Sequence, residues 1–363
     1  AQREGGALWN NAGTMTVDNT SIEENSANGP ASDDGGGGIF NNGGTLVVLN
    51  NTLIADNDAA GTSGSGGGIF NFTGGTTTVS NSIISGNDAK RAGGGIEDQS
   101  AGGPGLTISN TSLLNNTTGA TPGNGGGIHI TGPGNADITT STISGNSASR
   151  DGGGLWNGSG IMTVTESTID DNDALGSASG TGGGGIWNNG GSLVVTRSTV
   201  SANRADQSSA NGGGIYNANG TIDVEYSTVS GNSANNEGGG IYNVGFANIS
   251  ASTIANNSAT EGGGIDQGIL ASNLTTIDNT IVADNSASGL GQDLNTTLGG
   301  YSSGGYNLIE QDDANVFPAV ATDIEGQDPN LGPLADNGGA SFTHAVMCPS
   351  PAVNAGDPGL VAR

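Results

Sequence analysis

The stretch that determines the fold reads Gly183-Gly184-Gly185-Ile186-Trp187-Asn188-Asn189-Gly190-Gly191-Ser192-Leu193-Val194-Val195-Thr196-Arg197-Ser198-Thr199-Val200-Ser201-Ala202-Asn203. A glycine block leads into an aliphatic residue, an alternating apolar and polar segment follows, and an aliphatic residue three places before an asparagine ends the unit. Alternation with a period of two is typical of short β-strands, and Gly, Asn and Ser between the strands indicate turns. The unit therefore predicts three short strands separated by turns.

This unit recurs ten times along the chain, at intervals of 24 to 32 residues and about 29 on average. The aliphatic residues after the glycine blocks are Leu8, Ile39, Ile69, Ile96, Ile128, Leu155, Ile186, Ile215, Ile241 and Ile265. The closing asparagines are Asn25, Asn57, Asn87, Asn116, Asn146, Asn172, Asn203, Asn232, Asn257 and Asn285. Phased aliphatic residues exclude a disordered chain, and a solenoid stacks equivalent residues at about 4.8 Å per turn. We predict an all-β fold, a right-handed parallel β-helix of about ten turns over residues 1–287, with an irregular capping segment over residues 288–363.

Two other repeat folds are less consistent with the unit. Leucine-rich repeats have an overlapping period and a phased asparagine, but leucine is scarce here and no segment of the unit has a helical pattern. A calcium-binding roll of nonapeptides is disfavoured because the period is not nine. Collagen is excluded, since the 70 glycines among 363 residues have no three-residue period.

The charge of the chain limits its partners. It carries 34 acidic residues against 7 Lys and Arg, a formal charge of −27. Nucleic acids and anionic membranes both require a basic surface, so neither is expected as a partner. No apolar run approaches the roughly 18 residues that a membrane-spanning helix needs, so direct membrane insertion is not expected either.

The two strictly repeated features have structural explanations. The glycine blocks provide positive φ angles or close backbone approach at one corner of every turn, because a phosphate-binding loop would need a following helix and a lysine. The closing asparagines are expected to tolerate a left-handed turn and to form an internal ladder of amide hydrogen bonds. Since all ten are equivalent, a catalytic role is not expected for them.

The position after each glycine-block aliphatic residue is predicted to point outward, because strand residues alternate between faces. It holds Trp9, Phe40, Phe70, Glu97, His129, Trp156, Trp187, Tyr216, Tyr242 and Asp266, which we call the outward stripe. One interpretation is a packing ladder shielded by loops or by the C-terminal segment. The other is an exposed surface that stacks sugar rings or binds a neighbouring protein.

Acidic residues gather in the loops that follow the closing asparagines. Asp170, Asp171 and Asp173 offer oxygen ligands of the kind that Ca²⁺ prefers, so they are the candidate calcium site, with a solvated acidic surface as the alternative. No other cofactor is expected. The single cysteine, Cys348, precludes an intramolecular disulfide.

Catalysis is the weaker expectation. Parallel β-helices include polysaccharide lyases and hydrolases, and the basic-acidic cluster that could serve such chemistry is Lys90 and Arg91 opposite Glu97 and Asp98. A surface ion pair explains that cluster equally well. No nucleophile–His–Asp constellation is evident in the sequence.

Two features carry a family resemblance. The repeats resemble those of polymorphic outer-membrane proteins, with an aliphatic residue in place of Phe in the Phe-x-x-Asn motif, as in Ile143-Ser144-Gly145-Asn146. The segment Asp328-Pro329-Asn330-Leu331-Gly332-Pro333-Leu334 is similar to the C-terminal region of bacterial secreted right-handed β-helix proteins of the choice-of-anchor type. The resemblance implies export and an extracellular or cell-surface location.

These observations lead to one preferred function and two alternatives. We expect an exported structural or adhesive surface protein without catalysis, whose partners are copies of itself or other surface proteins. The first turn has no evident cap, and free strand edges invite pairing, so head-to-tail assembly into a filament or layer is the specific form expected. The alternatives are a glycan-binding module that uses the outward stripe, and a polysaccharide lyase or hydrolase.

Overall fold

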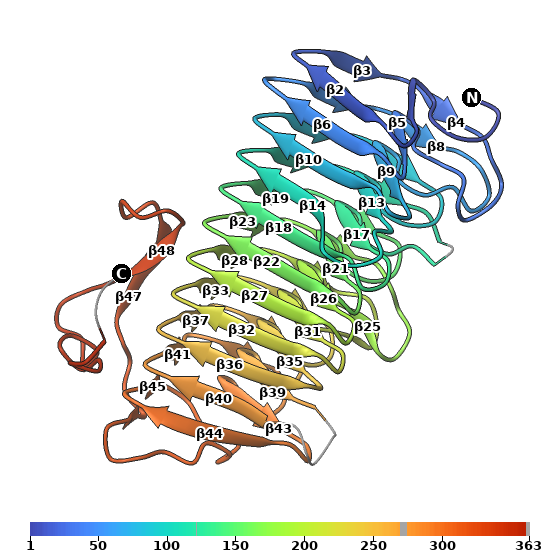
Figure 1. Ribbon diagram of the computed structural model, residues 1–363. Coiled ribbons are helices and arrows are strands. Elements are labelled where there is room, and N and C mark those ends of the chain that lie inside the picture. Colours follow the sequence, from blue (N-terminus) through green and yellow to red (C-terminus); the bar gives the residue numbers. More distant parts are fainter. Residues whose placement is uncertain (121, 269–273, 361–363) are drawn as a thin grey trace.

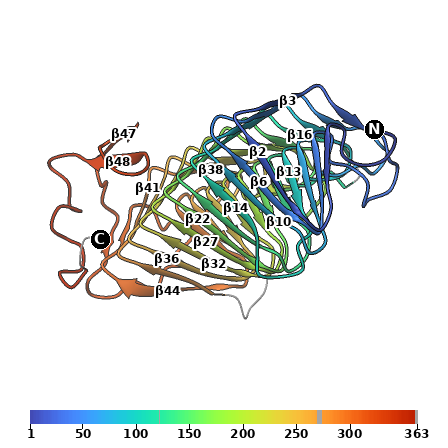
Figure 2. The same cartoon turned by 45° about the horizontal axis from the view of Figure 1, so that its top comes forward.

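The computed structural model describes residues 1–120, 122–268 and 274–360. In this part of the chain every regular element is a β-strand, and the strands wind into a rod of stacked turns (Figure 1). Figure 2 shows the same rod turned by 45°, with successive turns lying above one another. Equivalent residues of neighbouring repeats pair in parallel register, as Ile186 does with Ile215. The prediction of an all-β parallel solenoid of about ten turns is confirmed.

Each turn contributes one strand to each of four parallel sheets, which we call A to D in chain order. Sheet A contains β1 (Leu8–Asn10), β5 (Ile39–Asn42), β9 (Ile69–Phe72), β13 (Ile96–Asp98), β17 (Ile128–Ile130), β21 (Leu155–Asn157), β26 (Ile186–Asn188), β31 (Ile215–Asn217), β35 (Ile241–Asn243), β39 (Ile265–Gln267) and β43 (Leu294–Thr296). Sheet B contains β2 (Thr14–Asp18), β6 (Thr45–Leu49), β10 (Thr76–Ser80), β14 (Pro104–Ser109), β18 (Asn135–Thr139), β22 (Ile161–Thr165), β27 (Ser192–Thr196), β32 (Thr221–Glu225), β36 (Phe246–Ser250), β40 (Leu274–Asp278) and β44 (Gly300–Gly305).

The other two sheets complete each turn. Sheet C contains β3 (Ser21–Glu23), β7 (Leu53–Ala55), β11 (Ile83–Ser85), β15 (Ser112–Leu114), β19 (Thr142–Ser144), β23 (Thr168–Asp170), β28 (Thr199–Ser201), β33 (Thr228–Ser230), β37 (Thr253–Ala255), β41 (Ile281–Ala283), β45 (Leu308–Ile309) and β46 (Ile324–Glu325). Sheet D contains β4 (Ser26–Ala27), β8 (Asp58–Ala59), β12 (Asp88–Ala89), β16 (Thr117–Thr118), β20 (Ser147–Ala148), β24 (Asp173–Ala174), β29 (Arg204–Ala205), β34 (Ser233–Ala234), β38 (Ser258–Ala259) and β42 (Ser286–Ala287). The prediction of three strands per unit was therefore wrong by one, because the two-residue strand of sheet D is too short to show alternation.

The core is a narrow column of aliphatic side chains. In the turn quoted above, Ile186, Leu193, Val195, Val200 and Ala205 come from the four sheets, and each is fully buried. Burying a side chain such as Ile or Leu stabilises a fold by about 1.5–3 kcal/mol. Because the column is only a few side chains wide, a chain with 32% hydrophobic residues suffices to fill it.

The glycine block is required for two different reasons at successive positions. Gly183 has a φ of 63°, in the left-handed region that side chains disfavour. Gly184 has no such φ angle, but a Cβ there would lie 2.4 Å from the carbonyl oxygen of Arg204 and 2.5 Å from that of Gly213. A side chain at this corner would separate the turns, which confirms the interpretation of the glycine blocks.

The asparagine ladder is present and continuous. Nine hydrogen bonds, each 2.9 Å from Nδ2 of one asparagine to Oδ1 of the next, join Asn25 through to Asn285. The ladder asparagines do not themselves adopt the left-handed conformation, contrary to our expectation. The residue before each of them does, as Asp171 (φ 52°) does before Asn172. The side chain is thus free to enter the core while its neighbour makes the turn.

A second amide ladder lies on sheet A and is formed by the residue directly after each residue of the outward stripe, as Asn188 is after Trp187. Its bonds of 2.7–2.9 Å connect Asn10, Asn41 and Asn71, and then Asn157, Asn188, Asn217, Asn243 and Gln267. Asp98 and Ile130 interrupt it in the turns between. Asp98 accepts hydrogen bonds from Asn71 and from the hydroxyl of Ser100, and burial raises its pKa to about 6.

The chain beyond residue 287 first continues the solenoid and then leaves it. Strands β43 to β46 extend sheets A, B and C, and Val316 and Phe317 pack against the end of the core. Residues 326–360, which we call the strap, then turn back along the outer face of sheet C (Figure 1). The strap includes an antiparallel pair, β47 (Leu331–Ala335) and β48 (Thr343–Val346), and is otherwise irregular.

Candidate functional site

The outward stripe forms one stacked row on sheet A. Successive members pair from turn to turn, and their rings contact one another, with ring centroids 4.2 Å apart for His129 and Trp156 and 4.1 Å apart for Trp187 and Tyr216. The row points away from the core, as predicted, but it is largely covered. Phe40, Phe70, Glu97, His129, Trp187, Tyr216, Tyr242 and Asp266 are buried, Trp156 is half-buried, and Trp9 is 45% exposed.

The loops between sheet D and the next glycine block cover the row. The loop at Gly180 reaches the Tyr216 hydroxyl, and Glu237 accepts a hydrogen bond from Tyr242. Two of these loops pair through the short parallel strands β25 (Thr181–Gly182) and β30 (Ala210–Asn211). A ligand or partner would therefore meet mainly Trp9, whose indole Nε1 donates to Glu4 over 3.2 Å.

A buried charged cluster interrupts the aromatic row. The Glu97 carboxylate lies 2.8 Å from Nδ1 of His129, 3.5 Å from Nη1 of Arg91 and 2.5 Å from the Thr131 hydroxyl. Burial alone would raise the pKa of Glu97, but His129, with help from Arg91 and Thr131, outweighs burial and lowers that pKa. Glu97 and His129 are buried, whereas Arg91 and Thr131 are partly exposed, and the cluster joins the loop of one turn to the strand of the next.

The remaining members of the predicted basic-acidic cluster do not converge on Glu97. Lys90 pairs instead with Asp88 and, at 3.8 Å, with Asp58. Asp98 faces the interior, within the second amide ladder. The structure thus places the four residues in three separate environments.

The candidate calcium residues are engaged with other side chains and do not form a three-carboxylate cluster within the described part of the chain. Asp171 and Asp173 pair with Arg204 of the next turn, at 2.8 and 3.0 Å, and Asp170 accepts a hydrogen bond from Ser144. Within the described ranges, acidic oxygens approach one another within 4.8 Å at a different place, formed by Asp284, Glu310 and Asp328. Two of these side chains are exposed, and such groups are common on acidic surfaces. Cys348 is exposed and unpaired in the described structure.

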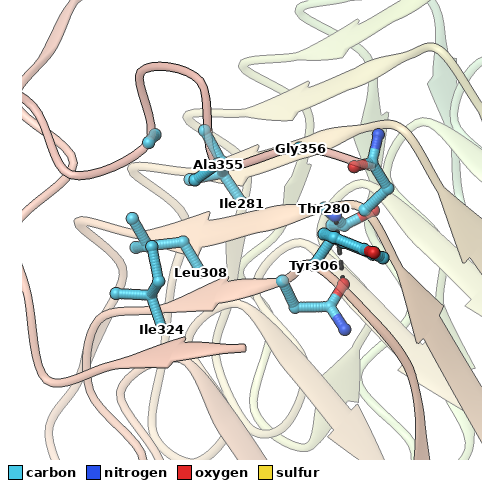
Figure 3. Close-up of a pocket in the computed structure, with 10 residues that line it drawn as sticks. Thr280, Ile281, Tyr306, Leu308, Ile324, Ala355 and Gly356 are labelled. Atoms are coloured by element: carbon cyan, nitrogen blue, oxygen red, sulfur yellow. Dashed lines mark hydrogen bonds between the residues drawn. The ribbon is translucent and has the colours of Figure 1, made fainter. Parts of the chain in front are cut away.

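A small cavity lies where the strap meets the last turns of sheet C (Figure 3). Its volume is about 120 Å³, and apolar side chains from both parts face it, including Ile281, Leu308, Ile324 and Ala355. The amide of Thr280 donates to Oδ1 of Asn307 over 3.0 Å beside it. The cavity is a gap between the strap and sheet C that is also lined by the polar residues Asn279, Thr280 and Asn307, and Tyr306 is its single titratable lining residue.

One family model matches the chain, over residues 226–244: the Chlamydia polymorphic membrane protein repeat. The matched stretch runs from sheet C to sheet A and includes Val229-Ser230-Gly231-Asn232 and the glycine block before Ile241. No curated protein and no solved structure matches the chain. The described part of the chain contains no helix long and apolar enough to cross a bilayer.

Two features of the structure were not predicted from the sequence. The second amide ladder was visible as a recurring Asn two places after the glycine-block aliphatic residue. The contacts between the strap and sheet C have no counterpart in any repeat, so no sequence pattern indicated them.

Proposed function

We propose that this chain is the rod of an exported bacterial surface protein, a right-handed solenoid with a structural or adhesive role. The observation that supports this best is the solenoid of repeats, one of which matches the polymorphic membrane protein repeat. A stack of ten turns at about 4.8 Å each is roughly 48 Å long and presents repeated outer faces. Such a rod suits display and multivalent contact.

The location is tested on intact cells of the source organism. Antibodies raised against the purified chain should label intact cells, and external protease should remove the signal. Labelling that requires permeabilisation would exclude a surface location. A cytoplasmic marker protein, probed on the same cells, controls for lysis.

The two ends of the rod differ in a way that bears on assembly. Among the described residues, β1, β2 and β3 pair with a neighbouring strand on one side only, whereas the Ser26 carbonyl of β4 accepts a hydrogen bond from the Ala1 amino group. Leu8 and Met15 are only partly buried at that end of the core. At the other end Val316 and Phe317 lie against the core. Head-to-tail assembly would bring the unpaired edges of β1, β2 and β3 of one copy onto the last turn of another copy. The segment that includes Val316 and Phe317, which covers that turn, would have to move away. Electron microscopy tests the proposal: filaments that lengthen on deletion of residues 312–322 would support it, and single rods of both proteins at high concentration would exclude it.

Glycan binding by the outward stripe is the second candidate, favoured by the exposed ring of Trp9. Replacing Trp9 by Ala should abolish binding on a glycan array if this ring stacks on sugars. Retention of all binding by that variant would exclude the stripe as the contact.

A further inference from the structure

A groove lies between the strap and the outer face of sheet C, away from the aromatic row. Its volume is about 370 Å³, and it is lined by Ser201, Ala202, Ser230, Gly231, Asn256, Pro333, Leu334 and His344. Ser230 ends strand β33 of the solenoid, and His344 lies in strand β48 of the strap. The fold thus brings together two reactive residue types that are 114 positions apart.

The hydrogen bonds of His344 define its tautomer. Nδ1 lies 2.7 Å from the backbone oxygen of Gly332, and Nε2 lies 2.8 Å from Oγ of Ser230. A carbonyl oxygen can only accept, so the neutral ring carries its proton on Nδ1 and leaves Nε2 as an acceptor. The Ser230 hydroxyl therefore donates to Nε2. A nucleophile bonded to a base, and a base oriented by a third group, is the arrangement that activates a serine.

We propose that Ser230 and His344 form a Ser–His couple that hydrolyses small uncharged esters in this groove. The Ser230 oxygen attacks the ester carbonyl carbon while its proton passes to Nε2 of His344. The tetrahedral intermediate collapses as the imidazolium returns that proton to the departing alcohol, which leaves an acyl group on Ser230. Water then attacks the acyl carbon, again with His344 as base, and releases the acid and the free serine.

The groove walls indicate the substrate class. Pro333 and Leu334 offer an apolar wall for a short acyl chain, and no Lys or Arg lines the groove to bind an anionic substrate. The exposed side-chain amide of Asn256 has no hydrogen-bond partner among the described residues, so it is available to donate to the developing oxyanion. A volume near the lower end of ligand pockets, about 300–1,000 Å³, suits a small ester.

The repeat supplies an internal control for this site. Ser201 pairs with Ser230 across sheet C, occupies the same repeat position one turn earlier and lines the same groove. Its hydroxyl makes no contact with His344 that the structure records. If hydroxyls in this groove reacted without the histidine, the two serines would behave alike. The inference goes beyond the proposed surface role and does not depend on it.

A fluorescent fluorophosphonate probe and p-nitrophenyl acetate test the couple on the full chain. We expect one adduct, located on Ser230 by peptide mass spectrometry, and ester hydrolysis that Ser230→Ala abolishes and Ser201→Ala leaves unchanged. His344→Ala should slow both reactions by about 100-fold or more, the range of general-base contributions. Thr199→Val separates chemistry from docking, because it removes the Thr199 hydrogen bond to the Phe342 carbonyl (2.8 Å) and leaves the couple intact. That variant should react within a few-fold of the wild type.

Several results would overturn the proposal. They are an unlabelled wild type, hydrolysis by Ser230→Ala at the wild-type rate, or equal losses in the Ser201→Ala and Ser230→Ala variants. Thermal unfolding followed by circular dichroism verifies that each variant is folded, so a loss of reactivity reports on the couple.

Discussion

Replacing one asparagine in the middle of the ladder should weaken the solenoid severely. The Nδ2 of Asn172 donates to Oδ1 of Asn203 and to the carbonyl of Ile143, both over 2.9 Å. Its Oδ1 accepts from Nδ2 and from the backbone N–H of Asn146, over 2.9 and 3.0 Å. Leu has the same branched shape as Asn but no polar atom, so Asn172→Leu removes these four bonds with little change in volume.

The expected loss follows from the groups left behind. The backbone N–H of Asn146 loses its acceptor, while the Asn146 side-chain amide keeps the Leu113 carbonyl at 3.0 Å. A buried donor without an acceptor costs about 1–3 kcal/mol, and the carbonyls that lose a donor add to this. We therefore expect the free energy of unfolding to fall by about 2–5 kcal/mol, measured by urea denaturation with circular dichroism. Hydrogen exchange should increase most in the turns on either side of residue 172, because each turn contacts only its neighbours.

The matched control lies in the next turn. Asn189→Leu changes an exposed asparagine in the same way, and its effect should stay within about 0.5 kcal/mol. If Asn172→Leu proved as stable as that control, the ladder would contribute nothing beyond filling space, and the reasoning would be refuted.

Three further predictions concern the corner, the buried carboxyls and the charged cluster. Gly184→Ala places a Cβ 2.4 Å from a carbonyl oxygen and should lower the melting temperature sharply. The control is Gly13→Ala, whose Cβ would have no atom within 4 Å and should leave the melting temperature unchanged. Equal effects of the two substitutions would contradict the argument that the backbones approach closely at Gly184. Burial raises the pKa of Asp266 from 3.8 to about 7 in the folded state. The folded state holds this carboxyl protonated, so stability is highest below pH 3.8, where the unfolded chain is protonated too, and it falls as the pH rises through 7. The urea midpoint should therefore be higher at pH 5 than at pH 8, and Asp266→Asn should reduce that difference; an unchanged difference in the variant would rule out this carboxyl as its source. His129→Ala should lower the free energy of unfolding by about 3–5 kcal/mol, because it leaves the Glu97 carboxylate buried without its main partner. Adding Glu97→Leu to that variant should recover most of the loss. No recovery would show that the loss of the His129 ring, and not the unpaired charge, caused the destabilisation.

Regularity explains which parts of the fold were predictable from sequence. Ile186 and Asn203 recur with one period, so stacking them in a solenoid was the natural solution, and the structure has both columns. The left-handed residue before each ladder asparagine was also predictable, because Gly, Asn or Asp, which tolerate a positive φ best, occupies that position in all turns except those of Glu24 and Ala202. Our prediction placed the left-handed turn at the ladder asparagine itself, one position too late.

The environment of the functional candidates depends on segments without a period. The outward direction of Trp187 followed from alternation, but its burial depends on loops of varying length that no repeat constrains. The pairing of Asp171 with Arg204 required knowing which side chains of adjacent turns meet outside the core. The contact of Ser230 with His344 depends on where the strap docks, and one docking event has no repeat from which to infer it.

The ladders and sheets run along the rod, and this has a mechanical consequence. A force that pulls the two ends apart acts on one junction between turns after another, so the rod should yield by unwinding single turns from an end. Each turn of about 29 residues would release roughly 100 Å of extended chain, at about 3.5 Å per residue. A molecule anchored at one end would thus lengthen in steps under tension and rewind when the tension falls, which would make it an extensible tether.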